Sequence, residues 1–212
     1  RTGVAVADVG TDHGYLPIWL LKSGKAVSAV AADIGEGPLT SAKQNAEKYH
    51  TTIKTVLSDG FKSISPEEFD DAVIAGMGGE LISRLISLAE YLRDKNKHLV
   101  LQPMTAIPEL RAFLFENGFI IDREEVVIED NKIYSVMLVY FVGEKTEFSP
   151  EEIYMGKILP NSENSREYAE KAVNRLKNQL KGLVHKGEAS EAKELEDTIN
   201  KITEKYLSAN LK

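Results

Sequence analysis

The strongest constraint on the fold is a regular alternation of short apolar runs and amphipathic stretches over the first half of the chain. The apolar runs are continuous, which is typical of parallel strands buried on both faces. Repeated strand–helix pairs predict a parallel sheet with helices on both of its faces. Strands are expected at residues 4–9, 27–34, 52–57, 71–75 and 98–102, and helices at 15–22, 38–49, 80–92 and 107–116.

The repetition ends in two longer strand patterns, residues 119–129 and 132–142, which Asp130 and Asn131 connect. A two-residue connection of this kind predicts a β-hairpin. The sequence therefore predicts an α/β, Rossmann-like fold with a mostly parallel seven-stranded sheet whose last strand is antiparallel. We expect that last strand to be inserted beside the first half of the sheet.

A second region follows a linker at residues 143–150 that is rich in Gly, Ser, Glu and Pro. From residue 163 onward, apolar side chains recur at steps of three and four in two stretches that Gly187 separates. Heptad-like seams of this kind predict an antiparallel, coiled-coil-like helical hairpin. We therefore expect two domains, residues 1–148 and residues 149–212.

The composition excludes several kinds of site. The chain of 212 residues has no cysteine, which excludes disulfides, cysteine zinc sites, iron–sulfur clusters and cysteine nucleophiles. Its four histidines lie far apart in the sequence, and we expect no metal. No long apolar run exists, so we expect no membrane span, and the lack of cysteine fits a cytoplasmic protein. Because Arg1 rather than Met comes first and a strand pattern follows almost at once, we expect native residues upstream.

The turn after the first expected strand contains two carboxylates, Asp8 and Asp12, together with Gly10 and Gly14. Ligands of open α/β sheets bind at the carboxyl ends of the strands. A dinucleotide-binding turn has a glycine near the position of Asp12, so that bare backbone reaches a pyrophosphate. Two carboxylates would repel phosphate, but they suit the ammonium and sulfonium groups of S-adenosylmethionine (SAM). A tight turn with a capping aspartate is the alternative.

Two further strands are expected to end in acidic residues. Asp33 suits a ribose diol, and Asp59, followed by Gly60, suits the amine of an adenine. Each is also consistent with an ordinary turn, and His13 fits a loop-holding role as well as that of a general base. Three acidic strand ends at one edge of a sheet together favour a SAM site.

The fourth and fifth expected strands end in segments that can line a ligand. Three glycines in residues 76–79 let the backbone approach a ligand, or they allow a close strand-to-helix turn. Gln102 offers both a donor and an acceptor. In the first helix, by contrast, we expect Tyr15, Leu16 and Trp19 to pack against the sheet.

The first helix of the expected hairpin is basic, although the chain has 33 acidic and 26 basic residues and a net charge of −7. Residues 171–186 include no acidic residue. This segment is either a solvated helix face or a surface for phosphate groups. Its basic residues are Lys171, Arg175, Lys177, Lys181 and Lys186.

Three motifs together resemble the bacterial tRNA (adenine-22-N1)-methyltransferase family, known as TrmK. They are Asp-Val-Gly-Thr-Asp-His-Gly-Tyr-Leu-Pro at 8–17, Ala-Gly-Met-Gly-Gly at 75–79 and Leu-Gln-Pro-Met at 101–104. The resemblance covers almost the whole chain, including the helical hairpin. It implies a class I SAM-dependent methyltransferase fold, and methylation of N1 of an adenine of tRNA at position 22. Members of the family usually have a further helical segment before the first strand.

The resemblance also implies roles for individual residues, with tRNA as the partner of the helical hairpin and a monomer as the expected state. Asp33 would hold the ribose of SAM, Ile34 would lie against its adenine, and Asp59 would bind the adenine edge. The full set implied for SAM is Asp8, Gly10, Thr11, Asp12, His13, Gly14, Asp33, Ile34, Asp59, Gly60, Gly76 and Met77. The set implied for the target adenine and the tRNA is Gly78, Gly79, Gln102, Pro103, Met104, Lys171, Arg175 and Lys181.

The chemistry independently favours a ring nitrogen. N1 of neutral adenine already carries a lone pair, so in-line methyl transfer needs positioning rather than a nucleophilic side chain. Methylation of pyrimidine C5 normally requires a cysteine. Enzymes that act on the exocyclic amine generally carry an Asn/Asp-Pro-Pro-aromatic motif, where this chain has Gly-Met-Gly-Gly. Asp12 is the first candidate for a catalytic carboxylate that stabilises the positive charge formed at N1, and the Gln102 carbonyl is the other. The base is expected to be turned out of its stack.

Two other classes of function stay open at this point. One is a small-molecule SAM-dependent methyltransferase with the same fold. The other is a non-enzymatic SAM-binding or coiled-coil interaction module, in which the helical hairpin forms a dimer seam. If the chain acts on tRNA, charge reversal on the basic helix should abolish tRNA binding and leave the affinity for SAM intact, which distinguishes it from a small-molecule methyltransferase. A non-enzymatic module would form a dimer in sedimentation and would transfer no methyl group to any acceptor.

Overall fold

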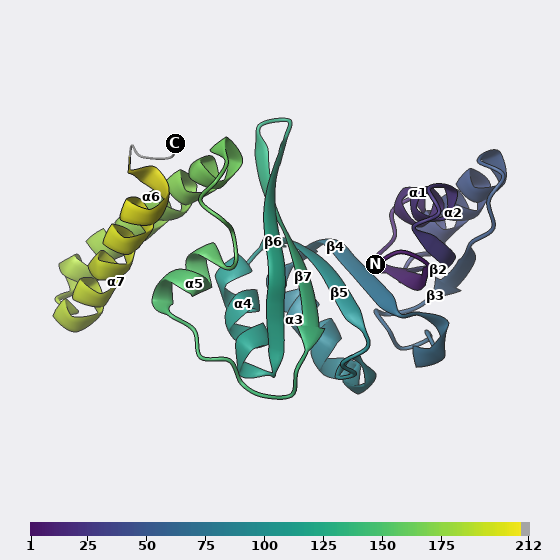
Figure 1. Ribbon diagram of the computed structural model, residues 1–212, viewed down its shortest axis with the longest axis horizontal. Coiled ribbons are helices and arrows are strands. Elements are labelled where there is room, and N and C mark those ends of the chain that lie inside the picture. The colour runs from purple at the N-terminus through teal and green to yellow at the C-terminus, as the bar shows by residue number, and fades with distance from the viewer. Residues whose placement is uncertain (209–212) are drawn as a thin grey trace.

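The computed structural model describes residues 1–208 and contains a seven-stranded sheet with the strand order β3-β2-β1-β4-β5-β7-β6 (Figure 1). Strands β1 to β5 are parallel, and β7 is antiparallel to both of its neighbours. The strands are β1 Val4–Val9, β2 Ala26–Asp33, β3 Lys54–Leu57, β4 Asp71–Gly78, β5 His98–Thr105, β6 Phe119–Glu129 and β7 Lys132–Phe141. The helices are α1 Tyr15–Lys22, α2 Glu36–Lys48, α3 Gly79–Leu88, α4 Ile107–Glu116, α5 Pro150–Met155, α6 Glu163–Lys186 and α7 Ala189–Ile202.

The place of the last strand corrects one prediction. β7 lies between β5 and β6, at the second half of the sheet, and not beside the first half. Asp130 and Asn131 both have left-handed backbone angles, with φ of 48° and 59°, which is the geometry of a two-residue hairpin turn. So short a turn keeps β7 next to β6, and the single helix α4 returns the chain only far enough to place this pair beside β5.

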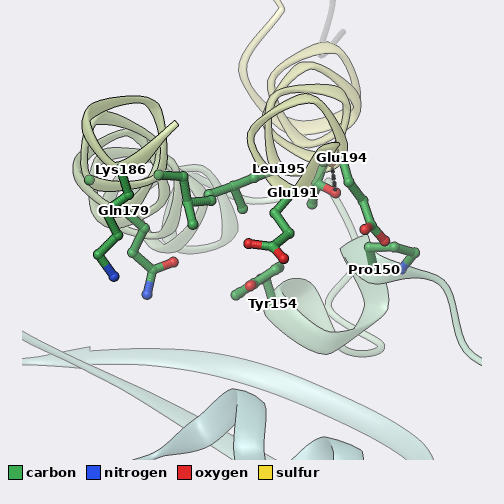
Figure 2. A pocket seen from close by; sticks show the side chains of 10 residues that line it. Pro150, Tyr154, Gln179, Lys186, Glu191, Glu194 and Leu195 are labelled. Atoms are coloured by element: carbon green, nitrogen blue, oxygen red, sulfur yellow. Dashed lines mark hydrogen bonds between the residues drawn. The ribbon is translucent and has the colours of Figure 1, made fainter. Parts of the chain in front are cut away.

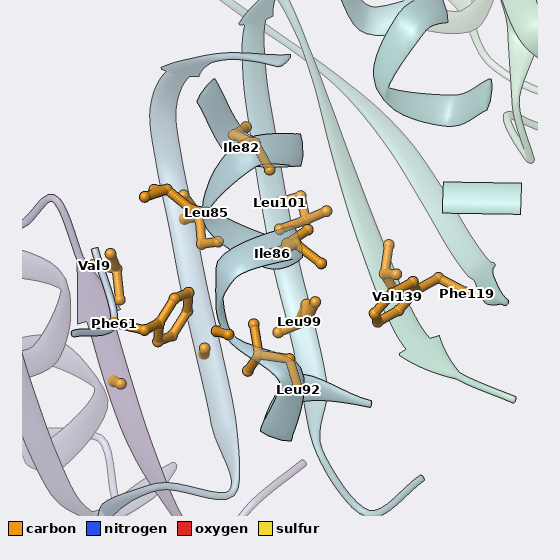
Figure 3. Packing of buried hydrophobic residues seen from close by; sticks show 14 of the residues in the cluster. Val9, Phe61, Ile82, Leu85, Ile86, Leu92, Leu99, Leu101, Phe119 and Val139 are labelled. Atoms are coloured by element: carbon orange, nitrogen blue, oxygen red, sulfur yellow. The ribbon is translucent and has the colours of Figure 1, made fainter. Parts of the chain in front are cut away.

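Alternate residues of the central strands face two separate cores, because successive strand side chains point to opposite faces. In β1, Val9 belongs to the larger core with α3 and α4, whereas Val6 packs on the opposite face with Leu20 and Leu21 of α1. Burial of each large aliphatic side chain contributes about 1.5–3 kcal/mol. Figure 3 shows part of the larger core, including Ile82, Leu85, Ile86, Leu99 and Leu101.

The first helix presents the opposite face from the one predicted. Its buried residues are Pro17 and Ile18. Tyr15 and Trp19 are instead 56% and 54% exposed, and Leu16 is 36% exposed. The expectation that these three pack against the sheet is therefore wrong, because an eight-residue helix has room for only one buried stripe and Ile18, Leu20 and Leu21 supply it.

The C-terminal region is a helical hairpin, as predicted (Figure 1). Helices α6 and α7 pack against each other, and Gly187 ends α6 with a left-handed φ of 77°. The chain continues from α7 through a π-helical turn, Thr203–Leu207. Residues 209–212 of the expected second domain lie outside the described residues. The buried seam consists of Ala169, Val173 and Leu176 with Ile199, Ile202 and Tyr206.

A short helix at the end of the linker, α5, was missed by the sequence analysis. Helix α5 begins after Ser149, whose side chain accepts a hydrogen bond from the Glu152 amide while the Glu152 carboxylate accepts one from the Ser149 amide. This reciprocal arrangement is a capping box, and the pattern Ser-x-x-Glu was its available signal.

One buried cation joins the hairpin to the sheet. The Arg111 guanidinium on α4 donates to the carbonyl oxygens of Ile153 and Tyr154 in α5, at 2.9 and 2.6 Å. It also donates to the Tyr168 hydroxyl on α6, at 2.9 Å. These bonds fix the start of the helical hairpin relative to the carboxyl edge of the sheet.

Candidate active site

The turn between β1 and α1 is anchored on its neighbours by backbone hydrogen bonds. The amides of Gly10 and Thr11 both donate to the Ala32 carbonyl of β2, at 2.8 and 3.0 Å. The chain then adopts a left-handed conformation at His13, whose carbonyl accepts from Asn45 Nδ2 at 2.9 Å. The turn is therefore held to β2 and α2, at the carboxyl edge of the sheet.

Two glycines of this turn are required by close contacts. A Cβ on Gly14 would lie 2.8 Å from the Ala42 Cβ, and a Cβ on Gly10 would lie 2.1 Å from the Met77 Cε. Both residues also have a positive φ, which favours glycine. The Met77 side chain therefore lies over Gly10 and brings the end of β4 to the first turn.

Asp8 is a buried carboxylate at the end of β1, with 6% of its surface exposed. Burial raises its pKa to about 6; the Thr11 side chain partly offsets that effect, and the negative charge of Asp33 adds to it. The Thr11 hydroxyl is itself buried and forms no hydrogen bond of regular geometry with any described residue. Two buried polar groups thus face each other with unused hydrogen-bonding capacity.

Asp12 and His13 lie at the solvent side of the same turn. His13 Nε2 is 3.0 Å from Asp12 Oδ1, and their side chains are 48% and 82% exposed. The His13 ring also lies 5.8 Å from the Tyr15 ring. Asp12 is thus a solvent-facing carboxylate whose oxygen is shared with an imidazole.

The other two acidic strand ends lie in different surroundings. Asp33 Oδ1 accepts a hydrogen bond from the Gly35 amide at 2.7 Å, while the neighbouring Ile34 is 73% exposed. Asp59 accepts from Lys62 Nζ at 2.6 Å, and this hydrogen bond holds the pKa of Asp59 below its usual value. Asp59 therefore offers an already paired carboxylate, whereas Ile34 offers an uncovered apolar surface beside Asp33.

Gly60 is explained by packing. A Cβ there would lie 2.4 Å from Leu85 Cδ2 on α3, and its φ is 63°. The glycine therefore lets the segment that follows β3 approach α3.

The ends of β4 and β5 are tied together by a side chain and a close contact. Gln102 Oε1 accepts a hydrogen bond from the Gly76 amide at 2.8 Å. A Cβ on Gly79 would lie 2.3 Å from the Ala106 carbonyl oxygen, and one on Gly78 would lie 3.0 Å from the Thr105 Oγ1. Gly78 and Gly79 thus allow α3 to begin directly against the end of β5.

The amide nitrogen of Gln102 is also occupied, since it donates to the Pro103 carbonyl at 3.2 Å and contacts Met104 Sδ at 3.4 Å. Pro103 is buried and Met104 is 48% exposed. Gln102 therefore shapes this edge through its own contacts, and Met104 presents the exposed surface.

The structure brings most of the residues assigned to SAM and to the target base to one edge, where β1, β4 and β5 end. Lys171 and Arg175 line a cavity beside Ile107, which follows this edge at the start of α4, whereas Lys181 is exposed farther along α6. Sequence reasoning missed Ala106, a non-glycine residue with a φ of 51°, and the buried Arg111. The only signal for the first was Pro108 in the first turn of α4.

The residues at this edge fit SAM. The unpartnered Thr11 hydroxyl and the buried Asp8 can bind polar groups, and the carboxylate of Asp8 suits a cation more than a phosphate. The exposed Ile34 beside Asp33 suits an adenosine, whose ring is apolar on its faces and whose ribose donates hydrogen bonds. The glycines of the first turn and of β4 leave the backbone accessible between them.

A separate groove of about 480 Å³ lies between α5, α6 and α7 (Figure 2). Its charges are mixed, with Lys186 opposite Glu191 and Glu194. Among residues 1–208, no helix is long and apolar enough to cross a membrane. The same residues contain no group of three or more metal-binding side chains.

A model of the family described as "TrmK: tRNA (adenine(22)-N(1))-methyltransferase" matches residues 6–204. The chain is 34% identical over 138 residues to the Bacillus subtilis tRNA (adenine(22)-N(1))-methyltransferase; the alignment covers 64% of this chain and 58% of that protein. The chain therefore spans less than two thirds of that relative. A candidate tRNA methyltransferase of Mycoplasma pneumoniae is 38% identical over 160 residues, which are 74% of this chain and 73% of that protein.

Solved structures agree. The crystal structure of a candidate tRNA (m1A22) methyltransferase of Streptococcus pneumoniae superposes with a TM-score of 0.81 and 31% identity, over 96% of this chain and 93% of that one. The same protein in complex with S-adenosyl-L-methionine gives a TM-score of 0.79 and 30% identity, over 96% and 92% of the two chains.

Proposed function

The chain belongs to the tRNA (adenine(22)-N(1))-methyltransferase family, a family of class I SAM-dependent methyltransferases, and we propose that it methylates N1 of adenine 22 in tRNA. The observation that carries the proposal is the family match over residues 6–204, which includes both the carboxyl edge of the sheet and the basic helix α6. A small-molecule methyltransferase with the same sheet would not need that helix.

SAM supplies an electrophilic methyl group on a sulfonium. We propose that Asp8 and Thr11 bind the cationic methionine part, together with the backbone of Gly10 and Gly14. Asp33 then accepts hydrogen bonds from the ribose, and Ile34 covers the adenine. Gly60, Gly76 and Met77 complete the walls, with Asp59 and its partner Lys62 at the adenine edge.

The reaction is an in-line displacement. The lone pair of adenine N1 forms the new N–C bond while the C–S bond breaks, and the electron pair of that bond stays on sulfur as a neutral thioether. The positive charge moves to the methylated base, and no proton transfer is required. The protein therefore acts chiefly by orienting the base in line with the methyl group.

The positive charge that forms at N1 requires a negatively charged or polar group nearby to stabilise it. Gln102 is a poor candidate, because its oxygen accepts from the Gly76 amide and its nitrogen faces the Pro103 carbonyl. We therefore assign this role to Asp12, a carboxylate at the mouth of the site. Gly78, Gly79, Pro103 and Met104 border the adenine, which has to leave its stack to expose N1.

The helical hairpin, residues 149–212, is proposed as the domain that contacts tRNA. Its helix α6 presents Lys171, Arg175 and Lys181 at its surface. Counterion release from the phosphates makes such binding weaken as salt rises. A monomer suffices for this arrangement, since the carboxyl edge and the basic helix come from one chain.

The test is direct. The protein is incubated with SAM and an unmodified tRNA transcript, the RNA is digested, and the nucleosides are identified by mass spectrometry. We expect 1-methyladenosine with the natural transcript and none with a transcript that carries guanine at position 22. Methylation of the altered transcript would contradict the position, and a protein that binds SAM yet forms no methylated nucleoside would contradict the function.

A further inference from the structure

A cavity of about 190 Å³ separates the catalytic part of the chain from the helical hairpin. We name it the α4–α6 cleft. Its walls come from the first turn of α4, from Ile133 at the start of β7, from α5, and from the first half of α6. The residues that matter here are Ile107, Pro108, Tyr154, Tyr168, Lys171 and Arg175.

The α4–α6 cleft adjoins the turn that connects the carboxyl end of β5 to α4. Strand β5 ends at Thr105, Ala106 turns the chain through a left-handed conformation, and α4 begins at Ile107. Gly79, at the start of α3, packs against the Ala106 carbonyl and so holds this turn in place. A ligand at Met104 therefore has the α4–α6 cleft as its neighbour along the chain.

Its aromatic wall is preorganised. The Tyr168 hydroxyl accepts a hydrogen bond from Arg111 Nη2 at 2.9 Å, and the guanidinium lies 5.7 Å from the Tyr168 ring. Arg111 is fully buried and also binds the Tyr154 carbonyl at 2.6 Å. Arg111 thus fixes the position of the Tyr168 ring, so little conformational entropy is lost when a flat group packs against it.

The charge of the α4–α6 cleft is of one sign. No acidic side chain lines it, whereas the groove between α5, α6 and α7 contains Glu191 and Glu194. Lys171 Nζ lies 3.5 Å from a Glu167 oxygen, so part of its charge is matched. Within residues 1–208, no ion pair engages Arg175, which is exposed one helical turn later. An aromatic wall with an unmatched guanidinium suits a base and its phosphate.

We propose that the α4–α6 cleft binds one unstacked nucleotide of the tRNA next to the target adenine. Its base packs against Tyr168 and Pro108, and its phosphate is bound by Arg175 with Lys171. The inference rests on the proposed function, because it assumes that the target adenine lies at Met104. It assigns two of the basic residues of α6 to a specific subsite, whereas the other basic residues attract the tRNA only through their charge.

The test compares two exposed cations on α6. Arg175→Ala and Lys177→Ala remove the same charge from one helix, but only Arg175 lines the α4–α6 cleft. We expect Arg175→Ala to raise the dissociation constant of tRNA about tenfold, as loss of a phosphate contact with a stacked base does, and Lys177→Ala to change it by about twofold at most. The KM for tRNA should follow, while SAM affinity and the melting temperature stay constant. Equal effects of the two variants would overturn the proposal in favour of unspecific attraction.

A second pair tests the aromatic wall. Tyr168→Phe keeps the ring and loses the hydroxyl, whereas Tyr168→Leu removes the ring, and melting temperatures identify any loss of folding. We expect tRNA to bind Tyr168→Phe only slightly more weakly than the wild type, because the ring stays and only its hydrogen bond to Arg111 is lost, and to bind Tyr168→Leu about tenfold more weakly. Equal affinities would exclude stacking. Binding of tRNA is measured separately from methylation. A wild type that binds tRNA but forms no 1-methyladenosine would therefore refute the proposed function alone. The affinities of the variants would still decide whether the α4–α6 cleft binds a nucleotide.

Discussion

The guanidinium of Arg111 and the carboxylate of Glu124 face each other at 2.5 Å, and neither side chain is exposed to solvent. The carboxylate also accepts hydrogen bonds from the Ser135 hydroxyl and, at 3.1 Å, from the Lys157 amide. Burial opposes the charge on Arg111, but Glu124 and Tyr168 outweigh it and raise the pKa of Arg111 above its ordinary value. Arg111 therefore stays charged, and its contacts and those of Glu124 link α4, β6, β7, α5 and α6.

Loss of one partner should therefore be costly. Arg111→Met leaves Glu124 as an unpaired buried charge, and we expect the free energy of unfolding to fall by about 3–5 kcal/mol. Urea denaturation measures this. The double variant Arg111→Met with Glu124→Gln removes the stranded charge, so it should recover part of the loss. A single variant as stable as the wild type would show that water or a rearrangement compensates Glu124.

The close approach of Gly79 to Ala106 gives a second prediction. In Gly79→Ala the new methyl meets a backbone carbonyl, which cannot rotate away, so we expect destabilisation of about 1–3 kcal/mol. Gly37→Ala is the matched control, since no atom lies within 4 Å of its Cβ and its helical position favours alanine. Thermal denaturation of both variants decides, and equal melting temperatures would argue against a tight contact.

The sequence predicted the features that depend on local pattern. The helix at 107–116 and the strand at 119–129 have the expected bounds, because the periodicity of the helix and the Asn-Gly pair that follows it, Asn117 and Gly118, are local signals. The predicted position of β7 and the predicted buried face of α1 were wrong, because both depend on which surfaces remain free once the sheet is assembled. A charged Arg111 in the interior had no local signal, since its partner Glu124 lies on another element.

At the site, the sequence located the edge but not the contacts. The glycines at 76–79 were recognised as a place for close approach, and the structure adds that Gly79 is required by Ala106 and Gly10 by Met77. Gln102 was expected at the mouth of the site with a free amide. Its hydrogen bond to Gly76 depends on the register of β4 and β5, which composition and spacing do not encode.

Asp12 provides the test of the catalytic assignment. Asp12→Asn keeps the shape of the side chain and removes the charge, so we expect kcat to fall by about ten- to a hundredfold if this carboxylate stabilises the product cation. SAM binding, measured by calorimetry, serves as the control for an intact turn. Full turnover with SAM still bound would end the role of Asp12 in catalysis.

The raised pKa of Asp8 predicts how stability changes with pH. Its ordinary value is 3.8 and burial raises it to about 6, so the folded protein binds this proton more tightly than the unfolded chain. The favourable contribution of Asp8 to the free energy of unfolding is fully present below about pH 4 and is lost as the pH rises to about 6. Asp8→Asn should therefore be more stable than the wild type by about 2–3 kcal/mol above pH 6, and no more stable at pH 4. Urea denaturation at the two pH values measures this difference.

Binding of SAM should change with pH in the opposite sense, because a cationic ligand requires the ionised form of Asp8 that destabilises the free protein. As pH falls through about 6, Asp8 takes up its proton, and the affinity for SAM should fall by about tenfold per pH unit below that value. Calorimetry between pH 5 and pH 8 follows this change, and Asp8→Asn is the control that should bind weakly with no such dependence. The ionised carboxylate of Asp8 therefore lowers the stability of the protein when the site is empty, and it stabilises the complex when the cation is bound. An affinity that is constant over this range would place the ammonium and sulfonium away from Asp8 and assign its burial to packing alone.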